Sequence, residues 1–346
     1  MKKTIFVMAV VLIISAYTNH CDAVTYEIID LGTWDSPSPQ SSALAINNSG
    51  QIVGCGDMGY GYYAFIYENG VMTNLGLKDT SARSINNNGQ IVGCRVGIPG
   101  HAFLYDNGSF TDLGTLGGSY SGAMGINDSG QVVGDSRVSI DSTHEHAFLY
   151  QNGIMTDLGT LGGTDSYALA INNSGKIVGG SHNSVGDFHA AIYEGGLWSD
   201  LGTLGGTNSQ AYAINNNNWI VGTADIASGD THAFLYKNGE MTDLGTLGES
   251  ESEAFGINNN GQIVGRVRST GYTQAFLYEN DTMIGLGTLP GGAESEAWGI
   301  NDNGWIVGFG RTASDETHAI LWKPIPEPAT LLLLGLGAVM LRRKRS

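Results

Sequence analysis

Apolar positions along this chain fall in short runs of four or five residues, and Asn, Gly and Ser separate the runs. One stretch shows the pattern, with runs at 167–171, 176–179, 189–193 and 197–201. Runs of this length, bounded by turn residues, predict β-strands. Because no sustained helical period appears between residues 24 and 323, the sequence predicts an all-β fold.

The group of four runs recurs along the chain. The pattern Ile-Asn-Asn-x-Gly-x-Ile-Val-Gly appears seven times, with small variations, at intervals of 39 to 45 residues. The first isoleucine of each copy, here called the marker isoleucine, is Ile46, Ile85, Ile126, Ile171, Ile214, Ile257 or Ile300. A near-constant period of this size indicates a repeat architecture with one supersecondary unit per copy.

Turn residues predict how the strands pair. Asn-x-Gly or Asp-x-Gly between the first and second strands predicts a tight hairpin, because these residues tolerate positive φ. Asn218 takes the place of the glycine in the fifth copy, and pairs such as Asn69-Gly70 join the third strand to the fourth. Each copy therefore predicts a four-stranded antiparallel meander, the size of one β-propeller blade.

The offset between the two ends of the repeat region predicts a closed ring. Residues 24–33 match the fourth-strand pattern seen at 241–246, whereas the last copy stops after its third strand at 318–322. The N-terminal strand can complete the last blade and leave no open edge. We predict a seven-bladed propeller over residues 24–323. A linear β-solenoid, the alternative, does not need this offset.

Small residues mark the first strand of each copy. Alanine stands three residues before every marker isoleucine, and Ala, Gly or Ser stands one residue before it. Alternate residues of a strand share a face, so this face is expected to crowd around the axis. The intervening residues are then predicted to pack between blades, although Arg83 fits that role poorly. They are Leu44, Arg83, Met124, Leu169, Tyr212, Phe255 and Trp298.

The two ends of the chain predict export. Lys2 and Lys3 precede an apolar run at 5–14, which predicts a secretory signal peptide over residues 1–23 with cleavage after Ala23. Residues 324–346 hold a tripeptide, then an apolar run at 329–341, then a basic cluster. The tripeptide is Pro326, Glu327 and Pro328, and the cluster is Arg342, Arg343, Lys344 and Arg345.

This tail resembles the PEP-CTERM sorting signal, which has the same three parts in the same order. The resemblance implies processing by an exosortase-type enzyme and delivery to the cell surface or an exopolysaccharide matrix. It also implies a transient inner-membrane contact through the C-terminal helix. An ordinary membrane anchor is the alternative, and both interpretations predict export.

The repeats themselves resemble a known family. Segments such as His-Ala-Phe-Leu-Tyr at 101–105 and Asp-Leu-Gly-Thr-Leu-Gly-Gly at 157–163 are similar to the extracellular HAF repeat. That resemblance implies an exported repeat protein and carries no defined activity.

The charge balance limits the class of partner. The net charge is −17, and six of the 16 basic residues lie in the two end segments. The predicted propeller is therefore more acidic than the whole chain and is expected to repel nucleic acid and anionic membranes. Exopolysaccharide or a surface protein remains as a partner.

Several residues could carry chemistry. Five histidines hold one repeat position and are predicted to make structural hydrogen bonds, since equivalent positions in different blades do not converge as metal ligands must. They are His101, His146, His189, His232 and His318. The Asn-rich turns faintly resemble calcium loops, but calcium prefers several carboxylates, so no cofactor is predicted. Cys55 and Cys94 could form a disulfide or remain as thiols.

Topology selects one face for binding. Second-to-third and fourth-to-first connections emerge on the same side of a propeller. A hydroxyl precedes each marker isoleucine by five residues and could line a polar funnel there, or could bond locally at the strand start. These residues are Ser41, Thr80, Ser121, Ser166, Ser209, Ser252 and Ser295. Tyr60, on the same face, is among the tyrosines that could stack on sugars.

No catalytic constellation emerges from the sequence. We therefore expect a non-enzymatic surface or matrix propeller that binds glycan or protein. One alternative is a lectin with an equivalent site in every blade. Another is a hydrolase or lyase acting on polysaccharide, which would need acidic residues converging in the funnel.

Overall fold

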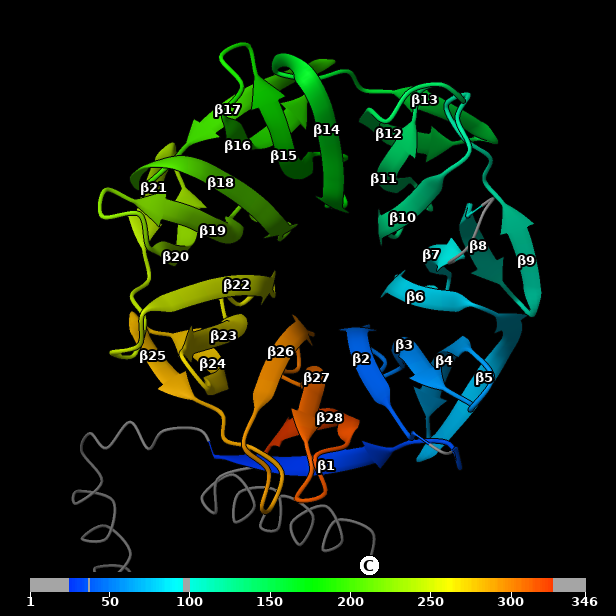
Figure 1. Cartoon of the computed structure of the whole chain (residues 1–346), viewed down its shortest axis with the longest axis vertical. Coiled ribbons are helices and arrows are strands. Elements are labelled where there is room, and N and C mark those ends of the chain that lie inside the picture. The colour runs from blue at the N-terminus through cyan, green and yellow to red at the C-terminus, as the bar shows by residue number, and fades with distance from the viewer. Residues whose placement is uncertain (1–24, 37, 96–99, 326–346) are drawn as a thin grey trace, which may run out of the picture. The chain divides into compact units, whose positions relative to one another are not determined.

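The computed structural model describes residues 25–36, 38–95 and 100–325. Within these ranges the chain forms strands and no helix. The strands group into seven four-stranded antiparallel sheets, which surround a central axis as the blades of a propeller (Figure 1). The predicted seven-bladed β-propeller is confirmed.

Each blade takes its innermost strand from one sequence repeat. Blade 1 consists of β2 (Ser41–Ile46), β3 (Ile52–Asp57), β4 (Tyr62–Glu68) and β5 (Val71–Lys78). Blade 2 consists of β6 (Thr80–Ile85), β7 (Ile91–Arg95), β8 (Ala102–Asp106) and β9 (Ser109–Asp112). Blade 3 consists of β10 (Ser121–Ile126), β11 (Val132–Arg137), β12 (Glu145–Gln151) and β13 (Ile154–Asp157). Blade 4 consists of β14 (Gly162–Ile171), β15 (Ile177–Asn183), β16 (Phe188–Glu194) and β17 (Leu197–Gly202). Blade 5 consists of β18 (Gly205–Ile214), β19 (Ile220–Ile226), β20 (Thr231–Lys237) and β21 (Glu240–Asp243). Blade 6 consists of β22 (Glu251–Ile257), β23 (Ile263–Ser269), β24 (Tyr272–Glu279) and β25 (Thr282–Gly285). Blade 7 consists of β26 (Ser295–Ile300), β27 (Ile306–Arg311), β28 (Thr317–Pro324) and, as its fourth strand, β1 (Tyr26–Gly32).

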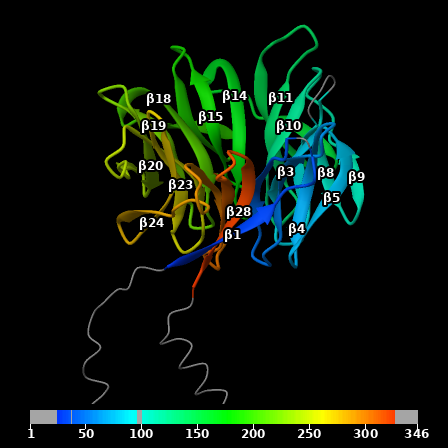
Figure 2. The same cartoon turned by 60° about the horizontal axis from the view of Figure 1, so that its bottom comes forward.

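The N-terminal strand closes the ring. β1 pairs with β28 at the outside of blade 7, and both views show the two strands side by side (Figures 1 and 2). Asp30 on β1 lies 2.9 Å from Nδ1 of His318, just as Asp243 lies 2.8 Å from Nδ1 of His232 within blade 5. The first strand thus supplies the contacts that a fourth strand supplies in other blades.

The predicted tight turns are present. Between first and second strands the glycine of each copy has positive φ, and Asn218 adopts φ 62° where it replaces that glycine. Asn69 and Gly70, between third and fourth strands, also have positive φ at 52° and 85°. The Asn and Gly residues of the repeat are therefore explained by backbone conformation.

The hydrophobic core lies between neighbouring blades. Ala43, Ile46 and Phe65 of blade 1 pack against Val307 and Leu321 of blade 7, and equivalent clusters join other blade pairs. The alanine three residues before each marker isoleucine is completely buried. Such side chains are small because two blades converge there.

The two ends of the axis differ in the connections they carry. We call the end with the first-to-second and third-to-fourth turns the turn face. The end with the second-to-third and fourth-to-first connections is called the loop face.

The predicted processing residues lie outside the described ranges. They are the cleavage residue Ala23 and the tail residues Pro326, Glu327, Pro328, Arg342, Arg343, Lys344 and Arg345. In the part of the chain that the structure describes, no helix has the length and apolar character needed to cross a membrane.

Candidate functional site

A β-bulge interrupts the innermost strand of every blade. In each blade the register of the first strand pair shifts at the residue two before the marker isoleucine, as between Ala43 and Ala45. A bulge leaves one residue unpaired and can turn its side chain in a new direction. The partner strand places Gly54 beside this bulge, where an added Cβ would lie 1.9 Å from the Ser42 carbonyl oxygen. That clash explains the glycine of Val-Gly.

The bulge residues line a cavity on the axis. The cavity has a volume of about 360 Å³ and is lined by Leu44, Arg83, Met124, Leu169, Gln210, Tyr212, Phe255 and Trp298. The prediction that the larger residues pack between blades is therefore wrong, because strict alternation fails at a bulge. Since Gln210 precedes Tyr212 on its strand, the cavity extends from the bulges toward the loop face.

Aromatic rings form a continuous shelf on one side of this cavity. Phe255 and Trp298 are stacked with centroids 4.6 Å apart and an interplanar angle of 12°. Tyr212 meets Phe255 edge to face at 5.3 Å. We call these three residues, from blades 5 to 7, the aromatic shelf. Their edge-to-face and stacked arrangements are favourable for aromatic pairs.

Charged groups hold the shelf in place. The Arg266 guanidinium lies 5.4 Å from the Phe255 ring centroid and is paired with Glu253 and, at 2.6 Å, with Glu296. The other Glu296 oxygen accepts a hydrogen bond from Trp298 Nε1 at 3.2 Å. The shelf is thus built before any ligand arrives, which reduces the entropy lost on binding.

A buried carboxyl lies on the next ring of positions toward the loop face. Asp135 follows the Val-Gly of blade 3 and is 3% exposed. Burial, reinforced by the Glu145 carboxylate and opposed by Arg83, raises the pKa of Asp135 to about 7. Burial and the neighbouring Asp135 also raise the pKa of Tyr120. Sequence reasoning missed Asp135, although its position differs among blades and holds cysteine in the first two.

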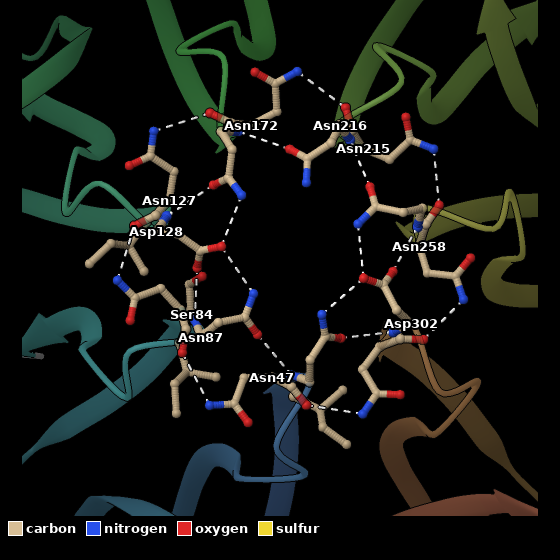
Figure 3. A pocket seen from close by; sticks show the side chains of 18 of the residues that line it. Asn47, Ser84, Asn87, Asn127, Asp128, Asn172, Asn215, Asn216, Asn258 and Asp302 are labelled. Carbon is tan, nitrogen blue, oxygen red and sulfur yellow. Dashed lines mark hydrogen bonds between the residues drawn. The ribbon is translucent and has the colours of Figure 1, made fainter.

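The turn face carries two rings of hydrogen bonds around a second, polar cavity of about 260 Å³ (Figure 3). The more deeply buried ring is here called the inner ring, although its hydrogen bonds lie farther from the axis in Figure 3, and the first asparagine after each marker isoleucine in it is 3–4% exposed. Its Nδ2 donates to the carbonyl oxygen of the equivalent asparagine in the next blade, at 2.9–3.1 Å, all the way around. The members are Asn47, Asn86, Asn127, Asn172, Asn215, Asn258 and Asn301.

The outer ring uses the residue that follows. Each backbone N–H donates to the side-chain Oδ1 of the equivalent residue in the next blade at 2.9–3.0 Å. Asp128 and Asp302 occupy two of these positions, and asparagine occupies the others. The Asn-rich turns that resemble calcium loops thus use their side-chain oxygens as acceptors within the protein.

Both acids of the outer ring are stabilised as carboxylates. Partial burial alone would raise the pKa of Asp302, but hydrogen bonds from the Asn259 backbone and side chain and from Asn48 lower it. The Asp302 Oδ2 accepts from Asn259 Nδ2 and Asn48 Nδ2, both at 2.9 Å. The pKa of Asp128 is lowered in the same manner.

We expect the Asp302→Asn variant to be less stable than the parent chain at neutral pH, because the amide nitrogen that replaces Oδ2 cannot accept from the two neighbouring Nδ2 groups. A carboxyl whose folded-state pKa is lowered contributes stability above its unfolded pKa of about 3.9 and loses it as the pH falls through the folded value. The difference in free energy of unfolding should therefore shrink as the pH is lowered below about 4. Urea unfolding of both proteins at pH 7 and pH 3 measures this difference. A difference independent of pH would contradict the lowered pKa of Asp302.

The hydroxyls predicted to line a funnel join blades instead. All are buried, and each donates to a carbonyl oxygen of the preceding blade at 2.5–2.8 Å. Each also accepts from a third-strand alanine N–H of that blade at 2.8–3.1 Å. Their assignment to a binding face is corrected, since both functions of the hydroxyl are used. They are Ser41, Thr80, Ser121, Ser166, Ser209, Ser252 and Ser295.

The repeated histidines make the structural contacts expected of them. Their Nδ1 atoms lie 2.7–2.9 Å from aspartate oxygens on the adjacent fourth strand, as in His189–Asp200 and His101–Asp112. The aspartate also accepts from the glycine N–H two residues later, for example Gly202 at 2.7 Å. This explains the Asp-Leu-Gly sequence. No group of three or more His, Cys, Asp or Glu side chains converges within the described ranges as metal ligands would.

Cys55 and Cys94 are free thiols in the structure. Cys94 is buried and Cys55 is partly buried. Burial raises the pKa of Cys55, a shift that a hydrogen bond to Ser81 opposes. A buried thiol with a raised pKa is a poor nucleophile.

Comparison with solved structures finds matches at low sequence identity. A puromycin-hydrolyzing peptidase from Mycobacterium tuberculosis aligns with a TM-score of 0.55 and 12% identity, over 86% of this chain and 55% of that one. TolB from Acinetobacter baumannii gives 0.48 and 12%, over 83% and 64%. A lectin from Aleuria aurantia gives 0.41 and 10%, over 72% and 97%. This chain covers less than two thirds of the peptidase and of TolB. Structural similarity at this level of sequence identity concerns the fold alone.

No curated protein matches the chain. Residues 324–345 match the model of the PEP-CTERM protein-sorting motif. The motif confirms the predicted sorting signal, and it implies export of this protein and recognition by an exosortase-type processing enzyme.

Proposed function

We propose that this protein is an exported, non-catalytic propeller of the cell surface or extracellular matrix that binds saccharide in its axial cavity, with one ligand per chain. The aromatic shelf carries this proposal. Sugar rings have apolar C–H faces that pack on aromatic side chains, and pockets of about 300–1,000 Å³ are typical of small-ligand sites. The sorting motif and the resemblance to HAF repeats agree with an exported location.

The pattern of variation among blades supports a single site. Positions that hold the fold together, such as the inner-ring asparagines, carry the same residue type in every copy. The bulge position does not, because it ranges from Leu44 through Arg83 to Trp298. A position that makes no structural contact common to all blades can vary in sequence, and its residues can then be suited to contact a ligand. A lectin with one site per blade would instead repeat its contact residues.

The acidic residues of the loops give little support to hydrolysis. Asp141, Asp187, Asp230 and Asp315 belong to four different blades and are exposed. None of them lines the axial cavity. Asp135 and Glu145 are close enough to influence each other electrostatically, but no hydrogen bond joins them within the described residues. We therefore favour binding over catalysis.

Co-sedimentation with the host exopolysaccharide tests this proposal. We expect residues 24–323 to pellet with the polymer, and the Trp298→Ala variant to bind about tenfold more weakly or worse, as is usual for a central tryptophan contact. Tyr60→Ala is the matched control, since Tyr60 is an aromatic residue 63% exposed on the loop face and outside the cavity.

Each outcome of that experiment has a clear meaning. Equal retention of the parent and the Trp298→Ala variant would overturn the axial site. Loss of binding on calcium chelation would favour a metal-dependent mode. Release of new reducing ends from the polymer would identify an enzyme and reject a purely binding role.

A further inference from the structure

Two arginines approach the axial cavity, and only one of them is neutralised. Arg266 is held between Glu253 and Glu296, so its charge is balanced by two carboxylates. Arg83 lines the cavity as an exposed residue and has no carboxylate within ion-pair distance among the described residues. In a chain with net charge −17, this guanidinium has no acidic partner within ion-pair distance among the described residues and is available to a ligand.

The position of Arg83 is opposite the aromatic shelf. Arg83 lies on β6 and Phe255 on β22, and these two innermost strands face each other across the axis (Figure 1). The rest of the cavity wall consists of the apolar side chains Leu44, Met124 and Leu169 and the polar side chain Gln210. The cavity therefore has one cationic wall, one aromatic wall and largely apolar sides.

We infer that the axial cavity selects a carboxylated sugar residue, with its ring against the aromatic shelf and its carboxylate on Arg83. This inference rests on the proposed saccharide function and names the ligand class for the same site. A guanidinium binds a carboxylate through two parallel N–H···O bonds, which fixes the orientation of the ligand as well as its charge. The opposed walls match the two chemical parts of a uronic acid residue.

The local charge agrees with an anionic ligand. Asp135 is a buried acid that interacts electrostatically with Arg83. Because the pKa of Asp135 is raised to about 7, this carboxyl is partly protonated at neutral pH and offsets Arg83 incompletely. The acidic remainder of the protein would repel a long polyanion, so the site favours a chain end or a short segment. The cavity volume of about 360 Å³ agrees with a ligand of that size.

Calorimetry with two oligosaccharides of equal length tests the inference. One contains glucuronic acid and the other contains glucose, and both are titrated into residues 24–323 at low salt. We expect one site per chain and a preference of about ten- to hundredfold for the acidic compound, the range of a hydrogen bond to a charged group. Arg83→Gln should remove that preference, so that the two compounds bind the variant with similar affinity.

Matched variants separate this inference from the proposed function. Arg95→Gln is the control, because Arg95 is an exposed arginine of the same blade that does not line the cavity. Equal affinity for both compounds, unaffected by Arg83→Gln, would overturn the inference. The proposed function survives if Trp298→Ala still weakens binding of both compounds. Failure of both compounds to bind would overturn both.

An acidic peptide serves as the third ligand. If a peptide ending in glutamate binds more tightly than the glucuronic acid compound, and Arg83→Gln weakens that binding, the carboxylate belongs to a protein partner and the sugar assignment is overturned. Tighter binding of the acidic sugar supports it. Urea unfolding midpoints of all variants establish whether the substitutions leave the fold intact.

Discussion

A chain shortened to begin at Trp34 will be less stable than the parent by more than about 3 kcal/mol and will tend to associate through β28. The shortened chain loses β1, and with it the burial of Leu31, which is 8% exposed. Replacing a buried leucine by alanine alone costs about 2–5 kcal/mol. The outer edge of β28 would also lose its hydrogen-bonding partner and become a template for other chains.

The loss extends to the junction with blade 1. Ser41 donates its hydroxyl hydrogen to the Gly32 carbonyl oxygen at 2.6 Å and accepts from Ala319 N–H at 2.8 Å. Without β1 the first of these bonds disappears, and His318 loses Asp30. One truncation thus weakens both the last blade and the joint between the ends of the ring.

A circular permutant gives the control for this truncation. The new chain would begin at Trp34 and carry residues 24–33 after Pro324, joined by an Asn-Gly turn as between β4 and β5. We expect its urea midpoint to return close to that of the parent, with monomeric size on gel filtration. A shortened chain with the parental midpoint would show that ring closure contributes little.

Most of the fold could be predicted because each structural role is repeated. Seven copies of one pattern make the strand boundaries visible, and Asn69-Gly70 or Asn218 indicate turns because few residues tolerate positive φ. The surplus strand at 24–33 and the missing fourth strand after 318–322 together predict closure. These features depend on local backbone conformation and on the number of strands, and both can be read from the sequence.

The axial cavity could not be predicted because it depends on a bulge. Strand alternation places Leu44 and its equivalents on the face opposite Ala43, toward a neighbouring blade. The inserted residue changes that direction, and nothing in the period-two pattern marks it. Only Arg83 gave a signal, since an unpartnered arginine conflicts with a packed interface. The conflict was resolved by the cavity.

The inter-blade hydrogen bonds were missed for a different reason. Asn47 and Asn86 are 39 residues apart, and the hydroxyl of Ser41 meets Ala319 from the other end of the chain. Sequence reasoning treats such residues within one turn or one blade. Such residues become neighbours only when the ring closes. The hydroxyls that join blades were therefore predicted as a possible binding face.

The inner asparagine ring leads to the second large effect, which we expect in the Asn215→Asp variant. Asn215 Nδ2 donates to the Asn258 carbonyl oxygen at 2.9 Å, and its Oδ1 accepts from two N–H groups of its own turn. The substitution keeps the acceptor and removes the donor. The buried Asn258 carbonyl oxygen then keeps only the Gly261 N–H, at 3.1 Å, as a donor, and a carboxylate is placed against it without a compensating hydrogen bond. We expect a loss of about 3 kcal/mol or more at pH 7.

The pH dependence of this variant has a definite sign. Burial and the facing carbonyl oxygen will raise the folded-state pKa of the introduced carboxyl above its unfolded value of about 3.9. The folded state then binds a proton more readily than the unfolded state, so the penalty is largest above the raised pKa and diminishes as the pH falls through it. The protonated carboxyl can also donate to the Asn258 carbonyl oxygen. Urea unfolding at pH 7.5 and pH 5 measures the recovery.

Asn216→Asp is the control, because it makes the same change of charge one residue away. Asp128 and Asp302 already occupy the equivalent outer-ring position in blades 3 and 7, and their carboxylates accept amide hydrogens from both neighbouring blades. We expect this variant to change the free energy of unfolding by less than about 1 kcal/mol. Similar losses in both variants would mean that negative charge at the turn face, rather than the missing Nδ2 donor, is destabilising. A large loss confined to Asn215→Asp would assign the cohesion of the ring to the amide hydrogens that pass from blade to blade.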